Sequence, residues 1–442
     1  MEGSLGVRVE TKDPAERRAP LTPEHVRRLV EDHGITVVVQ PSRSRVFPDA
    51  DYVRAGATLS PDLSRCNLIL GVKEVPPEDL LPGKAWMFFS HTMKGQPENM
   101  PMLRRLLELR GTLLDYERVV NERGRRLIAF GTYAGYAGMV NTVWALGRRL
   151  RWEGVDNPFD RIRRPHRYPG LDEVREALRE VGRIVRTVGL PMQVVPLVVG
   201  ITGQGRVSRG ALEILKVLPT ERLEPDDLSR FFRSGDFSAR VVYRVGFHQD
   251  DLYVPRDPDE RFDHYRLHRY PERYASRLEG MIGYLTVLVN GIYWEPRYPR
   301  ILTKSFLRSM WAANPNPRLR ILGDITCDVD GSLETTVRAT TIDDPVYVYE
   351  PLKDRIVPGV EGVGPVIMAV DKLPTELPKQ ASESFGDALL PFLPRLAHTD
   401  FGVHFEDLDL PAEFRGAVIA YRGELREEFR HLESVVLGSP SA

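Results

Sequence analysis

The sequence is poor in cysteine and lysine, and it lacks long apolar runs. Its two cysteines, Cys66 and Cys327, exclude a disulfide framework, and neither lies in a metal-binding spacing. The longest apolar stretch, residues 194–201, contains a proline and is far too short to span a bilayer. The N-terminus shows no apolar segment followed by a cleavage site, so we expect a cytoplasmic protein without a targeting signal.

Charge of one sign does not dominate either. The chain has 61 basic and 62 acidic residues, a formal net charge of -1, and no block of like charge. Neither nucleic acid nor a membrane surface is therefore an expected partner. Only nine of the basic residues are lysines, so a lysine inside a motif is more noticeable. With 42% hydrophobic and 28% charged residues, the 442-residue chain is expected to be globular and to form two domains.

Helix and strand signals alternate in the first third of the chain. A helix is predicted at residues 22–34, where Thr-Pro opens the pattern and a glycine closes it. Short apolar strands are predicted at residues 35–40, 68–72, 87–89 and 112–114. Strands separated by helices pair in parallel, which predicts an open α/β sheet.

A second α/β unit begins near residue 192, after a long helical pattern at residues 133–150. Its predicted strands lie at residues 191–203, 221–225, 284–289, 319–325 and 346–349. Residues 220–275 are highly polar and show little periodicity, so this segment has no predicted organisation beyond its first strand.

The predicted fold class is α/β, with two Rossmann-like domains and a cleft between them. We assign residues 1–140 to a substrate domain and residues 141–372 to a dinucleotide-binding domain inserted into it. Residues 373–442 contain helical patterns but few strand signals, so they are expected to return to the first domain.

A glycine-rich turn follows the predicted strand at residues 191–203 and opens a helix. Gly203 and Gly205 match the first two glycines of the dinucleotide-binding fingerprint, and Ser208 stands at the third. Such glycines let the backbone approach a pyrophosphate, which binds free N–H groups at the helix start, here around Arg206 and Val207. A strand-to-helix turn that needs glycine only for packing is the alternative, and the Gly-Lys-Ser/Thr ending of an NTPase loop is missing.

The choice between NAD(H) and NADP(H) stays open. An acidic residue about 20 positions after the turn binds the ribose 2′-hydroxyl in NAD enzymes, and Glu224 is the candidate. Arg206 or Arg222 would instead suit a 2′-phosphate.

Lys73 and His91 each follow a predicted strand of the first domain. The carboxyl ends of parallel strands meet at one edge of a sheet, where open α/β sheets bind their ligands. A lysine and a histidine at this edge can share proton transfer. Taken one at a time, each is more simply read as a polar residue at a strand end.

Several motifs occur in a fixed order between about residue 7 and residue 395: ERRAPLTP, GVKEVPPEDL, FFSHTMKGQPENM, LLDYERV, FGTYAGYAGM, YPERYASR, NGIYWE and SFGDALLPFL. In these motifs the chain resembles the lysine–ketoglutarate reductase family, most closely the reductase half of aminoadipic semialdehyde synthase. It is more distantly similar to fungal lysine-forming saccharopine dehydrogenase and to the alanine dehydrogenase and transhydrogenase-like superfamily.

The resemblance implies an oxidoreductase that acts on a CH–NH bond. Members of the family condense the ε-amine of lysine with 2-oxoglutarate and reduce the imine with NAD(P)H to saccharopine, or run the reverse reaction. By motif match, Lys73 and His91 stand at the acid–base pair. The other matched positions imply side chains that bind the substrate carboxylates and ammonium groups: Arg18, Lys94, Arg125, Glu74 and Glu117. Asp324 matches a position near the nicotinamide. For these six residues, a surface charge, an internal ion pair or a turn cap is the alternative reading.

Other functions remain open at this point. Pocket residues decide the substrate, so a related imine reductase or amino-acid dehydrogenase is the first alternative, and a non-catalytic NAD(P)-binding sensor is the second. The sequence does not distinguish a homodimer from a monomer. The second enzyme of the animal and plant fusion is expected to be absent, so a separate glutamate-forming saccharopine dehydrogenase is an expected downstream partner.

Overall fold

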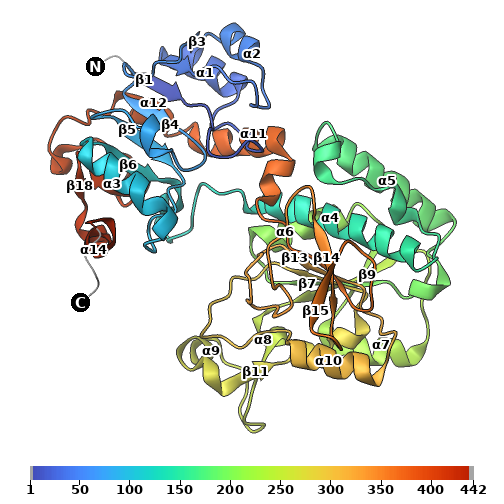
Figure 1. The fold of residues 1–442 in the computed structure, drawn as a ribbon. Coiled ribbons are helices and arrows are strands. Elements are labelled where there is room, and N and C mark those ends of the chain that lie inside the picture. The colour runs from blue at the N-terminus through green and yellow to red at the C-terminus, as the bar shows by residue number, and fades with distance from the viewer. Residues whose placement is uncertain (1–2, 438–442) are drawn as a thin grey trace. The chain divides into compact units, whose positions relative to one another are not determined.

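The structure is a computed structural model that describes residues 3–437. The chain divides into two compact units (Figure 1): residues 1–130 with 378–442, and residues 131–377. We call them the first and the second unit. The boundary lies before the predicted residue 141, because helix α4 (Gly131–Trp152) continues through that position. The buried side chains of α4 pack in the core of the second unit, which fixes the whole helix there.

The first unit is built on an eight-stranded sheet. Its order is β18-β17-β6-β5-β4-β1-β2-β3, and the first six strands in the sequence are parallel. The strands are β1 (Ser4–Val7), β2 (Thr36–Val39), β3 (Thr58–Leu59), β4 (Leu68–Leu70), β5 (Ala85–Phe88), β6 (Thr112–Asp115), β17 (Val418–Tyr421) and β18 (Glu424–Leu425). The C-terminal segment adds β17 to β6 in antiparallel orientation, so this segment completes the first sheet.

Local sequence explains the helices of this unit. In α1, Pro23 occupies the first turn, the Thr22 hydroxyl accepts a hydrogen bond from the His25 amide, and Gly34 ends the helix with a φ of 64°. The helices are α1 (Pro23–His33), α2 (Asp49–Arg54), α3 (Met100–Glu108), α11 (Pro378–Leu389), α12 (Leu393–His398), α13 (Ala412–Arg415) and α14 (Glu433–Leu437). One apolar core joins helices and strands from both ends of the chain.

The second unit has its own eight-stranded sheet, in the order β15-β14-β16-β13-β12-β7-β9-β8. The strands are β7 (Val198–Thr202), β8 (Thr220–Leu223), β9 (Val242–Phe247), β12 (Val287–Asn290), β13 (Ile321–Asp324), β14 (Val346–Glu350), β15 (Arg355–Pro358) and β16 (Val366–Met368). The six neighbouring strands β8, β9, β7, β12, β13 and β16 are parallel. β14 pairs with β16, and β15 with β14, in antiparallel orientation. A separate antiparallel ribbon pairs β10 (Tyr253–Pro255) with β11 (Tyr274–Ser276).

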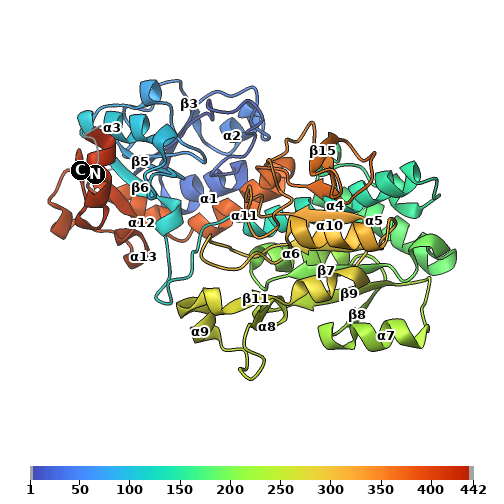
Figure 2. The same cartoon turned by 60° about the horizontal axis from the view of Figure 1, so that its bottom comes forward.

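Helices cover both faces of this second sheet (Figures 1 and 2). One core contains side chains of α4, α5 and α6, and the other contains side chains of α7, α8 and α10. These helices are α5 (Leu171–Thr187), α6 (Arg206–Leu215), α7 (Leu228–Ser234), α8 (Gln249–Leu252), α9 (His264–Arg269) and α10 (Lys304–Ala313). Because both faces are buried, the central strands are almost wholly apolar, as their sequences predict.

In each sheet the strand order reverses at one point. In the first unit the chain builds β1, β2 and β3 outward and then returns to β4 on the other side of β1. In the second unit it builds the β7, β8 and β9 side first and then returns to β12 beside β7. Open α/β sheets bind ligands at the carboxyl ends of strands where the order reverses, so both points mark candidate sites.

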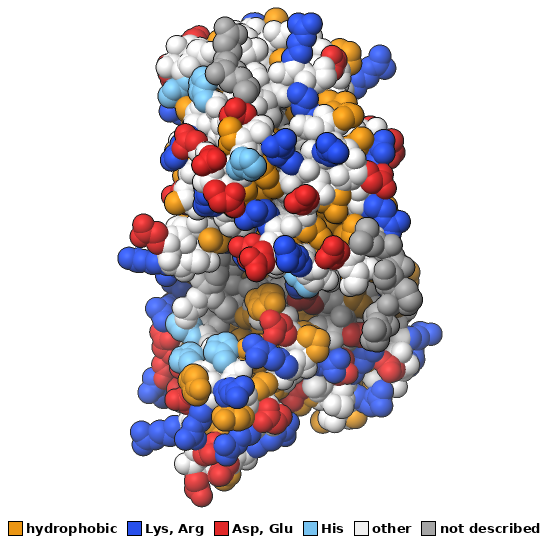
Figure 3. All heavy atoms as spheres, turned by 90° about the vertical axis from the view of Figure 1, so that its left-hand side faces the viewer, with side chains coloured by type: hydrophobic (Ala, Val, Ile, Leu, Met, Phe, Trp, Pro, Cys, Tyr) orange, Lys and Arg blue, Asp and Glu red, His pale blue; other side chains and the backbone are white. Residues whose placement is uncertain are grey.

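No helix of the described chain is long and apolar enough to cross a membrane. Basic and acidic side chains are interspersed over the face that Figure 3 shows, without a broad patch of one sign.

Candidate functional site

The reversal point of the first sheet brings charged side chains together. Glu10 and Lys12 follow β1, Lys73 and Glu74 follow β4, and His91 follows β5. Because β4 and β5 are parallel neighbours, the chain segments that leave them start at the same edge of the sheet. The first site is therefore a cluster of two carboxylates, two lysines and one histidine.

Glu74 is the centre of this cluster. Its Oε1 lies 2.5 Å from His91 Nδ1, and its Oε2 lies 3.3 Å from Lys12 Nζ. Burial acts to raise the pKa of Glu74, but the hydrogen bond and charge of His91 outweigh it and lower that pKa to about 2. The carboxylate thus stays ionised and holds the imidazole by Nδ1. Nε2 is then the ring nitrogen available for proton transfer.

The loop that carries His91 is held in an unusual backbone conformation. His91 has a φ of 46°, which non-glycine residues seldom adopt. The buried Asp115 carboxylate accepts hydrogen bonds from the Ser90 amide and hydroxyl, and the Asn99 amide group donates to the His91 carbonyl at 3.1 Å. These contacts on both sides of His91 support its conformation.

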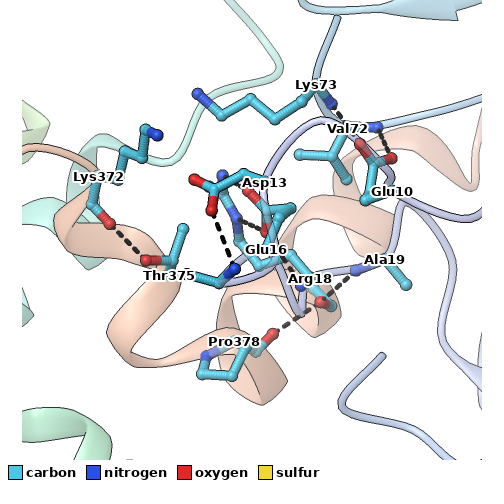
Figure 4. A network of polar contacts seen from close by, with 12 residues as sticks. Glu10, Asp13, Glu16, Arg18, Ala19, Val72, Lys73, Lys372, Thr375 and Pro378 are labelled. Atoms are coloured by element: carbon cyan, nitrogen blue, oxygen red, sulfur yellow. Dashed lines mark hydrogen bonds and ion pairs between the residues drawn. The ribbon is translucent and has the colours of Figure 1, made fainter. Parts of the chain in front are cut away.

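Glu10 binds the backbone at Lys73 (Figure 4). One carboxylate oxygen of Glu10 accepts from the Val72 amide at 2.7 Å, and the other accepts from the Lys73 amide at 3.1 Å. In Figure 4 the Lys73 side chain extends away from this carboxylate. Lys73 itself is half-buried.

The structure gives Arg18 a partner inside the protein. Its guanidinium makes two hydrogen bonds to the Glu16 carboxylate, at 2.8 and 2.6 Å (Figure 4), and lies 4.1 Å from the centre of the Phe130 ring. Arg18 is only 5% exposed. This is the internal ion pair that the sequence left as the alternative for Arg18.

The remaining charged candidates of the first unit are not drawn into the Glu74 cluster. Lys94 is exposed, and its amide donates to the Gln96 side chain. Arg125 is also exposed, in a turn that Asn121 caps. Glu117 is half-buried and forms an ion pair with Arg126 at 3.3 Å.

The glycine turn of the second unit has the geometry that the fingerprint predicts. It joins β7 to α6, and Gly203 has a φ of 83°, the left-handed region that favours glycine. Gly205 is the N-cap of α6, and a Cβ added there would meet no atom within 4 Å. Ser208, at the third position, donates its hydroxyl to the Thr202 carbonyl at 2.8 Å. The serine therefore ties the helix start to the strand end.

A cavity of about 940 Å³ opens at this turn, beside the end of β12. Its lining residues are Gly203, Gln204, Gly205, Arg206, Val207, His248, Gln249, Asp250, Leu252, Tyr253, His264, His268, Gly291, Ile292, Tyr293, Tyr298, Thr326 and Asp328. The volume suits a dinucleotide, and the bare backbone at Gly205 leaves room for a phosphate group beside the start of α6. The residues present therefore fit a nicotinamide dinucleotide.

Glu224 does not line this cavity. It follows β8, one of the two edge strands of the sheet, and forms an ion pair with Arg222 at 2.8 Å. Strand β9 lies between β8 and β7, so the residues after β9, not those after β8, come next to the glycine turn. His248, Gln249 and Asp250 occupy that position and line the cavity.

Asp324 is buried, 1% exposed, at the end of β13. It accepts hydrogen bonds from the Asn290 side-chain Nδ2 at 2.9 Å, the Thr326 hydroxyl at 2.7 Å and the Thr336 hydroxyl at 2.6 Å. Burial raises the pKa of Asp324, and these hydrogen bonds act in the opposite direction. Asn290 also accepts from Thr202, so one polar chain joins the ends of β7, β12 and β13 below the cavity.

Sequence reasoning missed three parts of these sites. Glu10 and Lys12 stand at the end of β1, a strand of four residues that left no clear signal. His248 lies in the polar segment that could not be organised. The pattern VVYRVGF at residues 241–247, a short β-branched and aromatic run, was the available signal for β9.

Comparisons with known proteins agree with this architecture. The family described as alanine dehydrogenase/PNT, N-terminal domain, matches residues 6–137. Solved structures of an L-alanine dehydrogenase (TM-score 0.61, 19% identity, 98% of this chain and 99% of that one) and of a transhydrogenase from Sinorhizobium meliloti (TM-score 0.56, 14% identity, 96% and 100%) share the fold. The predicted α/β class with two Rossmann-like domains is confirmed.

Curated relatives match over nearly the whole chain. Alpha-aminoadipic semialdehyde synthase of Arabidopsis thaliana is 40% identical over 99% of this chain and 42% of its own length, and the mitochondrial enzyme of that name from Bos taurus is 37% identical over 98% and 48%. The chain thus spans about half the length of these relatives. The NAD(+), L-lysine-forming saccharopine dehydrogenase of Neurospora crassa is 29% identical over 88% of this chain and 90% of its own length. The resemblance that the motifs predict, to aminoadipic semialdehyde synthase and lysine-forming saccharopine dehydrogenase, is therefore confirmed.

Proposed function

We propose that the chain catalyses the NAD(P)H-dependent condensation of L-lysine with 2-oxoglutarate to saccharopine, or the reverse reaction. The observation that carries this proposal is the Glu74–His91 pair, which lies beside Lys73 at the reversal point of the first sheet. The similarity to proteins named for saccharopine and aminoadipic semialdehyde supports the same reading.

Lys73 and His91 are the proposed acid–base pair. Forming an imine requires a proton to leave the amine and the carbinolamine oxygen to depart as water. Each proton transfer is most efficient with an acid or base whose pKa lies near the operating pH. One of the two residues would move the amine protons, and the other would protonate the departing oxygen. Glu74 would keep the imidazole of His91 in one orientation, with Nε2 toward the substrate.

The cavity at the glycine turn is the proposed cofactor site. A nicotinamide cofactor bound there would supply or accept the hydride. Amides around Gly205, Arg206 and Val207 at the start of α6 would hold the pyrophosphate. The ribose substituent would lie near the end of β9, where His248 and Asp250 replace Glu224 as the candidates for reading it.

Saccharopine has three carboxylates, which require fixed cations. Lys94 and Arg125 are exposed, and we propose that they bind these carboxylates, since ammonium and guanidinium groups form charge-assisted hydrogen bonds with carboxylates. Arg18 would act through its ion pair with Glu16 rather than as an open cation. Glu117 is proposed for a substrate ammonium group. Asp324, below the cavity, would support the nicotinamide end through Thr326.

The test follows absorbance at 340 nm with NADPH, and separately NADH, in the presence of lysine and 2-oxoglutarate. We expect consumption that requires both substrates, and the ratio of the two rates identifies the preferred cofactor. Folded protein that binds a cofactor but consumes none with this pair would replace the proposal by a related imine reductase with another amine or 2-oxo acid.

A homodimer, a separate glutamate-forming saccharopine dehydrogenase downstream and a cytoplasmic location stay predictions. Several relatives are named as mitochondrial enzymes, so the predicted cytoplasmic location requires a direct test.

A further inference from the structure

A buried carboxylate terminates the strand pairing next to Lys73. The β1–β4 ladder ends where the Arg8 amide donates to the Leu70 carbonyl. Beyond that point the next amides after β4 donate to the Glu10 side chain instead of to the backbone of the first strand. Its Oε1 accepts from the Val72 amide at 2.7 Å, and its Oε2 accepts from the Lys73 amide at 3.1 Å (Figure 4).

The Glu10 carboxylate is itself held in place by a buried ion pair with Arg8. The Arg8 guanidinium donates to Glu10 Oε2 at 3.1 Å, and the two side chains are 3% and 5% exposed. Arg8 also donates to the Thr11 hydroxyl at 3.0 Å. Both Glu10 oxygens thus accept hydrogen bonds, which is the pattern of an ionised carboxylate. Burial raises the pKa of Glu10, and Arg8 acts against that shift.

The chain leaves space for this contact at Gly71. A Cβ at Gly71 would stand 3.0 Å from Arg8 Cδ and 3.4 Å from Glu10 Oε1. A side chain at residue 71 would therefore press on the same ion pair that holds Lys73. Glycine at this position allows the carboxylate to reach two successive amides.

We infer that Glu10 is a positioning residue for Lys73. The inference rests on the proposed function, in which Lys73 transfers protons. Glu10 binds the Val72 and Lys73 amides, while the Lys73 side chain extends the other way (Figure 4). Glu10 therefore fixes the backbone from which the Lys73 side chain extends, rather than the amine at its end. Small displacements of a reacting group lower rates strongly, by as much as about 100-fold for 1 Å.

The first test is a double-mutant cycle. Glu10→Gln keeps the size of the side chain but faces one backbone N–H with an NH₂ group. We expect it to lower kcat by about 10- to 100-fold, with a much smaller effect on KM. In a Lys73→Met background the same substitution should lower the residual rate by less than about threefold, because the positioned group is gone. Equal losses in both backgrounds would reduce Glu10 to a structural residue and overturn the inference.

The matched control is Glu78→Gln. Glu78 lies in the same loop as Lys73 but is exposed, so its substitution removes a carboxylate without touching the Val72 or Lys73 amides. We expect rates within about twofold of the unmodified protein. If Glu10→Gln does not fold, Glu10→Asp keeps the charge but shortens the reach, and it should show the same dependence on Lys73.

A second readout does not require activity. Labelling of the Lys73 amine with an amine-reactive reagent, measured by peptide mass spectrometry, reports the placement of this side chain in any folded variant. We expect Glu10→Gln to change the labelling rate of Lys73 more than threefold and to leave that of Lys216, in the second unit, unchanged. Labelling that changes without any turnover of lysine and 2-oxoglutarate would support Glu10 while rejecting the proposed function. Labelling at the unmodified rate would overturn the inference whatever the activity.

Discussion

Two glycines of the same turn should respond to alanine in opposite ways. Gly203 has a φ of 83°, and a Cβ there would lie 3.1 Å from Ile292 Cγ2 and 3.1 Å from Ser208 Oγ. Gly205 has a φ of -71°, and a Cβ there would meet nothing within 4 Å. Gly203→Ala therefore strains the free protein, whereas Gly205→Ala fits it.

The expected magnitudes follow from these positions. A left-handed backbone costs an L-residue about 1–2 kcal/mol, and the two tight contacts bring the loss of stability for Gly203→Ala to about 2–3 kcal/mol. Gly205→Ala should leave the free energy of unfolding within about 0.5 kcal/mol. Its methyl group would instead occupy the space that a pyrophosphate needs beside the start of α6, so cofactor affinity should fall at least about tenfold.

The assay combines urea unfolding with fluorescence titration of NADPH and NADH for both variants. The decisive result is the pair of measurements on Gly205→Ala. Normal stability with weakened cofactor binding places the pyrophosphate at this turn. Normal stability with normal binding would refute the reasoning, since the open space at Gly205 would then serve no ligand.

Two further predictions concern the first unit. The pKa of Glu74 is lowered to about 2, so its ionisation adds about 2–3 kcal/mol to the folded state above pH 4.5 and loses that contribution as the pH falls toward 2. The stability difference between the unmodified protein and Glu74→Gln, from urea unfolding, should thus shrink below pH 4.5; a difference independent of pH would contradict the ion pair with His91. Lys73→Met and His91→Gln should each lower kcat by at least about 100-fold with cofactor affinity retained, and near-normal rates in both would remove the acid–base assignment.

Much of the fold could be predicted because each central strand is a short apolar run between helices. The strands that end before Lys73, His91 and Gly203 were expected near their observed positions, and parallel pairing then puts their ends at one edge of each sheet. This rule needs only local sequence and the general geometry of α/β sheets.

The order of the strands could not be predicted in the same way. Glu224 follows the second strand of the second unit, where the fingerprint expects its acidic residue, but β9 is inserted between β8 and β7. A crossover that skips one position in the sheet leaves no local signal. The sequences of its helix and strand have the same patterns whether the strand pairs with its neighbour in the chain or one position further out. The ion pair of Arg18 with Glu16 shows the same limit, since a sequence does not distinguish a cation that awaits a ligand from one already neutralised.

Because a serine stands at the third fingerprint position, a glycine is required at a different place, just after β12. In the usual fingerprint the third glycine allows close packing of helix and strand. Here the Ser208 hydroxyl fills that space and donates to the Thr202 carbonyl, and a Cβ at Gly291 would lie only 2.6 Å from it. Gly291, just after β12, is therefore the residue that must lack a side chain.

This exchange predicts coupling between the two positions. Gly291→Ala should destabilise the protein by about 1–3 kcal/mol, because the new methyl group overlaps the Ser208 hydroxyl. Ser208→Ala alone should cost about 1 kcal/mol through the lost hydrogen bond. In the double variant the overlap disappears, so urea unfolding should give a total loss at least about 1 kcal/mol smaller than the sum of the two single losses. Strict additivity would mean that Gly291 is needed for another reason, such as close approach of a ligand to the cavity wall that it lines.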